Sequence, residues 1–109
     1  MDVFEVTECR QDGCVVITCA GEVDLATAGT LTDALMRVQR PPPERIVLDL
    51  TAVTFMGSSG LAVLVAAHNQ FGRDRLRIVA PTDTILRLLH LTRLDEVLVV
   101  LPQLDAALL

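Results

Sequence analysis

The chain has 109 residues, 51% of them hydrophobic, and a mean hydropathy of +0.50, so it can form one domain over residues 1–109 that buries about two-thirds of its unfolded surface. Its formal net charge of −5 disfavours binding to the phosphate backbone of DNA or RNA, and we expect no nucleic-acid partner. No apolar run approaches the roughly 20 residues of a membrane-spanning helix. Residues 1–10 carry acids before their first base, unlike a secretory signal. We therefore expect a cytoplasmic protein without membrane insertion.

The first predicted element is a hairpin. Residues 3–9 alternate between apolar and polar side chains, which predicts an edge strand, and Asp12-Gly13 supplies the turn into a second strand over residues 14–20. Gly21-Glu22-Val23-Asp24 is expected to break this second strand.

Three cysteines lie in or beside the hairpin: Cys9, Cys14 and Cys19. They form no Cys-x-x-Cys pair and have no histidine near them in the sequence, so a zinc site is not expected. Cys9 and Cys14 could face each other across the hairpin, but a cytoplasmic disulfide would be unusual. We expect buried or half-buried free thiols without a redox role.

A first helix follows the hairpin, because apolar residues recur at helical spacing on one face. Asp24 or Thr27 could cap its start, and Pro41-Pro42-Pro43 marks its end. Residues 45–50 then form a nearly continuous apolar run, which predicts a central strand covered on both faces. The residues of the helical stripe are Ala28, Leu31, Leu35 and Val38.

The second half of the chain predicts two more helices and two more strands before a short C-terminal helix. A helix is expected from Ser58 to Phe71, with Gly72 near its end, then a strand over residues 76–80 and a helix that starts at Pro81-Thr82-Asp83. The last strand is expected over residues 97–101. The expected apolar stripes are Leu61, Leu64, Val65 and His68 in the second helix, Ile85, Leu88 and Leu89 in the third, and Leu104 and Leu108 in the C-terminal helix.

Strands that alternate with helices after an opening hairpin predict an α/β fold. We expect a mixed, mostly parallel sheet of four to five strands packed with three to four helices.

The junction between the central strand and the second helix carries the most informative pattern, Gly57-Ser58-Ser59-Gly60. It places two hydroxyl groups at a helix start, where unpaired N–H groups and the helix dipole favour an added negative charge. A phosphorylated serine at this place would act as a switch. On the residues alone, however, a serine at a helix start is more often only a cap, and Phe55 and Met56 before it read as core residues.

Three segments, in order along the chain, resemble the STAS family, and in particular its bacterial anti-sigma factor antagonists. They are Gly21-Glu22-Val23-Asp24, Ile46-Val47-Leu48-Asp49-Leu50 and Phe55-Met56-Gly57-Ser58-Ser59-Gly60-Leu61.

This resemblance implies a STAS domain that works by partner switching. The unphosphorylated antagonist binds an anti-sigma factor that is also a serine protein kinase and so releases a sigma factor for transcription. Phosphorylation of the first serine of the motif, here Ser58, prevents that binding, and a PP2C-type phosphatase restores it. The positions that the resemblance places at the partner surface are Asp24, Thr27, Met56, Gly57, Ser58, Ser59 and Gly60.

One position departs from the family pattern, because Gly57 stands where the family usually has an aspartate. The missing carboxylate supports an alternative, a STAS docking or scaffold module that is not phosphorylated, in a signalling assembly or a lipid transporter. An enzyme is not expected, since the motif is not a Gly-x-Ser-x-Gly nucleophile elbow and all nine basic residues are arginine, which removes lysine-dependent chemistry. We therefore expect no catalytic residue, no cofactor and no metal.

Overall fold

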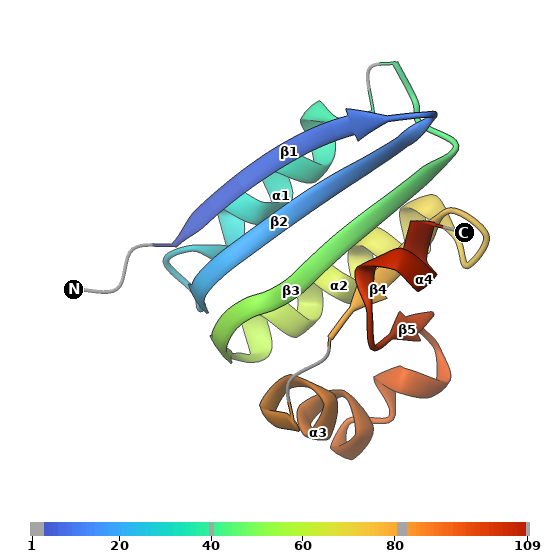
Figure 1. Ribbon diagram of the computed structural model, residues 1–109. Coiled ribbons are helices and arrows are strands. Elements are labelled where there is room, and N and C mark those ends of the chain that lie inside the picture. Colours follow the sequence, from blue (N-terminus) through green and yellow to red (C-terminus); the bar gives the residue numbers. More distant parts are fainter. Residues whose placement is uncertain (1–3, 40, 81–82, 109) are drawn as a thin grey trace.

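The computed structural model describes residues 4–39, 41–80 and 83–108, and Figure 1 shows its backbone. One five-stranded sheet has the strand order β1-β2-β3-β4-β5, so neighbours in the sheet follow the order of the chain. The strands are β1 (Glu5–Gln11), β2 (Cys14–Val23), β3 (Arg45–Met56), β4 (Leu76–Val79) and β5 (Val100–Leu101). The helices are α1 (Ala28–Arg37), α2 (Ser58–Phe71), α3 (Asp83–Leu91) and α4 (Leu104–Leu108), with a 3₁₀ helix, η1 (Leu94–Glu96), before β5.

The strand directions confirm the predicted mixed, mostly parallel sheet. β1 pairs antiparallel with β2, and every later neighbouring pair is parallel. The strand predicted to be central, β3, is the middle strand of the five. The α/β class predicted from the alternation of strands and helices is therefore confirmed.

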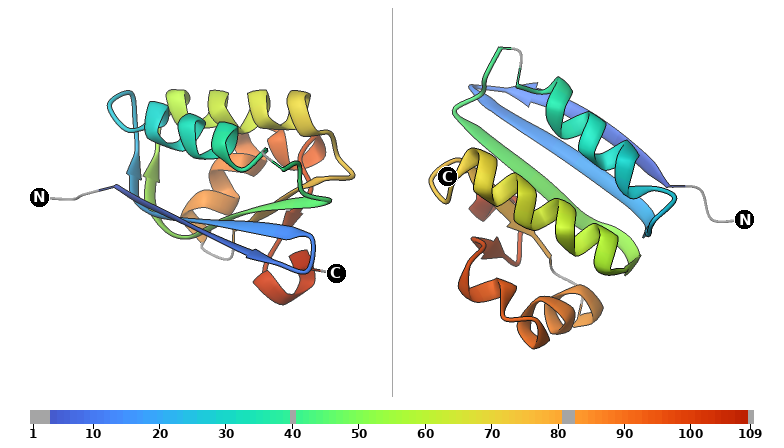
Figure 2. Two further views of the ribbon diagram at one scale, coloured as in Figure 1. Left: turned by 90° about the horizontal axis from the view of Figure 1, so that it is seen from above. Right: turned by 180° about the vertical axis from the view of Figure 1, so that it is seen from behind.

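Helices cover both faces of this sheet. Figure 2 shows α1 and α2 on one face and α4 on the opposite face. The main core lies beneath α1, α2 and α3 and includes Leu48 of β3, whereas its neighbour Val47 belongs to a smaller cluster with Val79 and Ala107 beneath α4. Successive residues of β3 therefore point into two different cores, which explains its continuous apolar run.

The opening hairpin has the predicted turn but longer strands. Asp12 (φ 51°) and Gly13 (φ 82°) both lie in the left-handed region that a tight hairpin turn requires. The predicted break at Gly21 is wrong, because β2 continues to Val23. Gly21 (φ 104°) bends the strand, and the pairing register shifts beside it. Pairing then resumes because β3 also continues beyond Leu50. Phe55 and Met56 of β3 pair with the last two residues of β2.

The first two helices have the predicted positions, and α2 buries a different face from the one expected. In α1 the stripe that includes Leu31 and Leu35 is buried, and Val38, just beyond the helix, is buried too. Residues 41–43 follow its end, as predicted. In α2 the side predicted to be buried is only half-buried, apart from Leu64. The helix packs against the sheet and α1 through a different row of residues, two of which are small. The buried row of α2 is Gly60, Leu64, Ala67 and Phe71.

The C-terminal third agrees with the predicted element types and differs in their lengths. β4 ends at Val79, one residue before the predicted end, and the predicted helix start at Pro81-Thr82 lies outside the described residues. α3 buries Ile85 and Leu89. The last strand is only two residues long, because the chain before it turns back on itself in η1 and packs Leu98 into the core.

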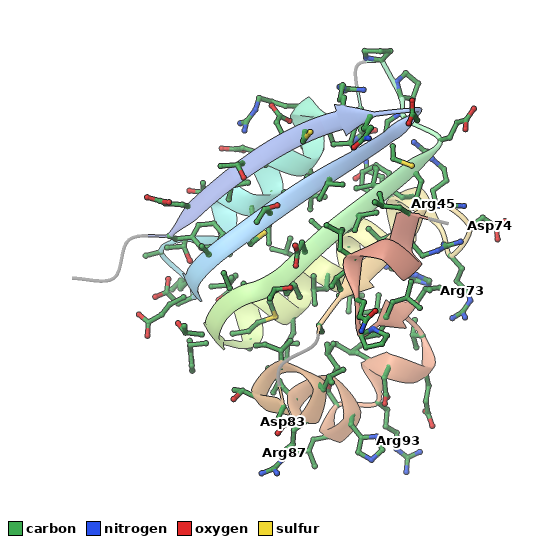
Figure 3. The ribbon with its side chains drawn as sticks, viewed as in Figure 1. Arg45, Arg73, Asp74, Asp83, Arg87 and Arg93 are labelled. Carbon is green, nitrogen blue, oxygen red and sulfur yellow. The ribbon has the colours of Figure 1, made fainter. Side chains whose placement is uncertain are left out.

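The C-terminal helix is held by the start of the central strand. α4 spans the predicted positions Leu104 and Leu108. A guanidinium nitrogen of Arg45, Nη1, donates a hydrogen bond of 3.1 Å to the carbonyl oxygen of Leu108, and Figure 3 shows Arg45 beside this helix.

The three thiols are free, and their positions correct one expectation. Cys9 pairs with Val16 and Cys14 with Gln11, so the two cysteines do not face each other across the hairpin. Cys19 is buried and Cys14 half-buried, as expected. Cys9 is exposed, because it lies on an edge strand and none of the described helices covers it.

Among the described residues, no helix has both the length and the apolar character needed to cross a lipid bilayer.

Candidate functional site

The carboxyl ends of β2 and β3 meet at one end of the sheet. Val23 pairs with Met56 as the last rung between the two strands, and the N–H of Gly57 donates a hydrogen bond of 2.9 Å to the carbonyl oxygen of Val23. Figure 1 shows the turn from β2 into α1 and the turn from β3 into α2 side by side at this end. Two segments separated by the 27 residues between Thr27 and Phe55 thus form one surface, which we call the switch surface (residues 24–27 and 55–60).

Ser58 is the first residue of α2 and is exposed. The N-cap position before it belongs to Gly57, whose backbone is extended (φ −88°, ψ −175°) and whose lack of a side chain leaves the helix without a side-chain cap. Within the described part of the chain, neither serine hydroxyl of the motif has a hydrogen-bond partner. The interpretation of Ser58 as a helix cap is therefore wrong, and its hydroxyl is free at the end of the helix where anions are favoured.

The turn on the other side of the switch surface is tied together by Asp24 and Thr27. The Oδ1 oxygen of Asp24 accepts hydrogen bonds from the N–H groups of Ala26 (2.9 Å) and Thr27 (3.1 Å). The Thr27 hydroxyl donates to the carbonyl oxygen of Glu22 (2.8 Å) and accepts from the N–H of Asp24 (2.9 Å). Thr27 stands at the N-cap position of α1 but makes no capping bond there, so both predicted cap residues hold the turn before the helix instead.

Gly60 lets α2 begin close to the strand ends. A Cβ atom at this position would lie 2.7 Å from Cγ of Met56 and 2.8 Å from Cγ1 of Val23, both closer than packed atoms approach. The same construction at Gly57 meets nothing nearer than Cε2 of Phe55 at 3.5 Å, an ordinary contact. Glycine is therefore sterically required at position 60 and is not required at position 57.

The residues predicted at the partner surface lie together but differ in depth. Ser58 is exposed, and Asp24, Thr27, Gly57 and Ser59 are half-buried. Met56 (4% exposed) and Gly60 are buried, so they shape the switch surface from beneath.

Two large apolar side chains on this surface were missed by the sequence interpretation. Phe55 is 49% exposed and Leu25 is 86% exposed, so the prediction that Phe55 is a core residue is wrong, whereas the same prediction for Met56 is confirmed. Near its end β3 buries every third residue, Leu50, Val53 and Met56, and this pattern leaves Phe55 on the outside. The sequence contains a signal for this exposure. Thr54, Gly57 and Ser58 flank Phe55 and Met56 where the chain turns from β3 into α2.

No group of three or more histidine, cysteine, aspartate or glutamate side chains in the described part of the chain is placed to hold a metal ion.

Residues 7–107 match the family model described as STAS domain. The chain belongs to the STAS domain family. The match covers nearly the whole chain, and the five-stranded mixed sheet with its helices is the STAS fold.

Similar proteins share this STAS domain over most of their length. A protein of Mycobacterium tuberculosis (strain H37Rv) named anti-sigma-F factor antagonist RsfB is 36% identical over 96 residues, which cover 87% of this chain and 79% of the relative. A protein of Listeria monocytogenes named anti-sigma-B factor antagonist is 31% identical over 97 residues, covering 87% of this chain and 84% of the relative. The crystal structure of an anti-sigma factor antagonist from Mycobacterium paratuberculosis has a TM-score of 0.91 to this STAS domain at 36% identity, covering 97% of this chain and 92% of that chain.

Proposed function

We propose that this STAS domain, taken as residues 1–109, is an anti-sigma factor antagonist. It binds an anti-sigma factor that is also a serine protein kinase, and this binding releases a sigma factor. The observation that carries the proposal is the exposed Ser58 hydroxyl on an uncapped helix start, beside the turn held by Asp24. The 36% identity to RsfB of M. tuberculosis over 87% of the chain supports the same role.

Phosphorylation of Ser58 switches this binding off. A phosphate adds about −1.5 to −2 charges and three acceptor oxygens. The free N–H groups of the first turn of α2 stabilise that charge, so the phosphorylated protein stays folded. A partner surface that fits a neutral hydroxyl is repelled by it, and the neighbouring carboxylate of Asp24 adds to the negative potential. A PP2C-type phosphatase reverses the modification.

The partner touches the exposed part of the switch surface directly. Asp24, Thr27, Gly57, Ser58 and Ser59 make these contacts, while the buried Met56 and Gly60 fix their positions. The protein itself is a regulator and catalyses no reaction, and it works in the cytoplasm, where sigma factors act.

The test uses the purified protein and the purified anti-sigma factors encoded in the same genome. Each is incubated with ATP, and the products are measured by intact mass and peptide mapping, with Ser58→Ala and Ser59→Ala as a matched pair. We expect one phosphate on the wild type and on Ser59→Ala, and none on Ser58→Ala. Phosphate that persists on Ser58→Ala, or its absence from every form, contradicts the switch.

Binding separates the switch from a simpler structural role. Titration calorimetry with the same anti-sigma factors should show that Ser58→Ala retains binding and that Ser58→Asp weakens it by about tenfold or more, since each 1.4 kcal/mol is a factor of ten. Equal binding by both variants contradicts the proposal. Unchanged unfolding temperatures for both variants show that any loss arises at the interface.

A second function, a docking or scaffold module that is never phosphorylated, is favoured by one observation. Gly57 removes the carboxylate that the family usually places before the acceptor serine, and nothing in the local packing forces glycine there. Such a module binds a signalling assembly or a lipid transporter and leaves Ser58 unmodified. The phosphate-mapping experiment decides between the two functions.

A further inference from the structure

An apolar groove lies between the end of β3 and α3, and it has a volume of about 260 Å³. Phe55 and Met56 of β3 form one wall. The other wall is formed by Ile85, Leu88 and Leu91 of α3.

The groove exists because α3 carries more apolar residues than the core uses. Ile85 and Leu89 point into the core, whereas Leu88 is half-buried and Leu91 is 73% exposed. Leu88 and Leu91 are three residues apart, so they form a second apolar row on the helix surface. After Leu91 the chain turns at Arg93 (φ 60°) into η1, and among the described elements none covers this row.

The groove is continuous with the switch surface. Phe55 and Met56 belong to both, and Cε2 of Phe55 lies 3.5 Å from the position that a Cβ atom of residue 57 would take. Met56 also packs against Gly60 in the first turn of α2. A protein that covers Ser58 therefore reaches the mouth of the groove without a break in the contact surface.

One wall of the groove carries a positive charge. Arg87 of α3 lines it and is exposed, and Figure 3 shows Arg87 and Arg93 pointing away from the sheet. Asp83 lies one turn before Arg87 on α3, but among the described residues the two form no ion pair, so the Arg87 guanidinium is available beside the apolar side chains. Its complement is a carboxylate next to a large apolar residue.

The lining of the groove favours apolar side chains of a protein over a free small molecule. The groove is open and almost entirely apolar, with Thr84 and Arg87 as the polar residues of its lining, so it offers few directed contacts to fix a small ligand. An amphipathic helix binds a hydrophobic groove through its apolar face, with residues at spacings of three and four as anchors.

We propose that this groove receives an amphipathic helix of the anti-sigma factor, with a large apolar side chain between Phe55 and Leu91 and a carboxylate against Arg87. The inference rests on the proposed function and extends its interface from the phosphorylation site to α3. The apolar anchor supplies affinity that Ser58 does not control, and the phosphate then acts at one edge of a larger contact.

The test measures binding of the purified anti-sigma factor to Leu91→Gln, Arg87→Glu and the control Met36→Gln. Leu91 is largely exposed at the end of α3, so glutamine retains size and helix propensity without a fold defect. Met36 on α1 is also an exposed apolar residue (53%). It lies beside Gln70, near the end of α2 that is farthest from Ser58. We expect Leu91→Gln to raise Kd about tenfold, as for an interface anchor, while Met36→Gln stays within about twofold of wild type.

The charge contact has its own signature. Arg87→Glu should raise Kd, and added salt should partly restore its binding, because the substitution sets two carboxylates against each other and salt screens their repulsion. A photoreactive residue in place of Leu91 should cross-link to a helix of the anti-sigma factor, and one in place of Met36 should not.

The two proposals fail in different ways. If Ser58→Asp abolishes binding while Leu91→Gln and Arg87→Glu bind like the wild type, the groove inference is overturned and the switch stands. If no anti-sigma factor binds the wild type, the proposed function is overturned, and this inference with it. If the photoreactive residue in place of Leu91 cross-links to no part of the anti-sigma factor although the complex forms, the helix is not the occupant and the inference is overturned.

Discussion

The N–H of Gly57 donates a hydrogen bond of 2.9 Å to the carbonyl oxygen of Val23. This bond joins the last residue of β2 to the residue that precedes α2, so the turn that contains Asp24 and the helix start that contains Ser58 are held in a fixed relation. Since Val23 is fully buried, the joint is also protected from water. A chemical change at Ser58 is therefore presented on a rigid surface that includes both segments.

Gly60→Ala should destabilise the protein. The added methyl group would lie 2.7 Å from Cγ of Met56 and 2.8 Å from Cγ1 of Val23, and both neighbours are buried and cannot move aside freely. Overpacking of this kind costs about 1–3 kcal/mol, which exceeds the helix propensity gained from alanine. Chemical denaturation measures the loss in free energy of unfolding.

Gly29→Ala is the matched control for this substitution. Gly29 is exposed in α1, and a Cβ atom there would meet no atom within 4 Å. It should therefore stabilise the protein by about 0.5 kcal/mol through helix propensity alone. Equal effects of the two substitutions would show that packing against Val23 and Met56 does not constrain position 60.

Gly57→Asp should stabilise α2. The backbone at Gly57 is extended at φ −88°, which any residue adopts, and its nearest neighbour leaves room for a side chain. Aspartate at an N-cap is better than glycine by a few tenths of a kcal/mol, and its charge near the helix start adds about 0.3–1 kcal/mol. Thermal unfolding at low and high salt measures both contributions.

Gly57→Ala serves as the comparison, because alanine cannot cap and is worse than glycine at an N-cap position. The order of unfolding temperatures should be aspartate above glycine above alanine. If aspartate is no more stable than alanine, position 57 does not act as the cap of α2.

Thr27→Val should loosen the turn between β2 and α1. The substitution retains the shape of the side chain but removes the hydroxyl that bonds to Glu22 and Asp24 at 2.8 and 2.9 Å. Because the position is half-buried, water can replace part of the lost hydrogen bonding. We therefore expect the free energy of unfolding to fall by about 1–2 kcal/mol. Hydrogen exchange of the Asp24 amide should quicken. Thr30→Val, an exposed position one turn further along α1, should change stability by less than about 0.5 kcal/mol.

The stability of the protein should fall at alkaline pH because of Cys19. Burial, and to a smaller extent the negative charge of Asp49, raises the pKa of the Cys19 thiol to about 12 from 9.0. Above pH 9.0 the unfolded chain loses this proton while the folded protein retains it until about pH 12, so in this window the free energy of unfolding falls with rising pH. The slope for one group is about 1.4 kcal/mol per pH unit.

Cys19→Ala identifies the source of that slope. The chain contains no lysine and no tyrosine, so neither residue type titrates in the same range. The variant should be less stable near neutral pH, because it leaves a small cavity, and should lose part of the alkaline slope. Denaturation curves at several pH values between 7 and 11 make the comparison, and an unchanged slope would exclude Cys19 as its cause.

Much of the architecture could be read from the sequence, because local patterns specify local structure. The bounds of α2, the tight turn at Asp12-Gly13 and the central position of β3 were all predicted correctly. In each case a short-range signal decides the outcome, such as a glycine after a helix or an apolar run with no polar face. The position of Ser58 at a helix start followed from the same kind of signal.

Tertiary structure alone decided where the strands end and which side chains are exposed. β2 passes its glycine because β3 continues beside it and pairs with it, and no local pattern in either strand encodes the length of its partner. For the same reason Phe55, which looks like a core residue, remains outside, and the outer row of α3 stays uncovered. Propensity and periodicity act over a few neighbouring residues, whereas strand pairing and exposure depend on segments that only the folded chain brings together.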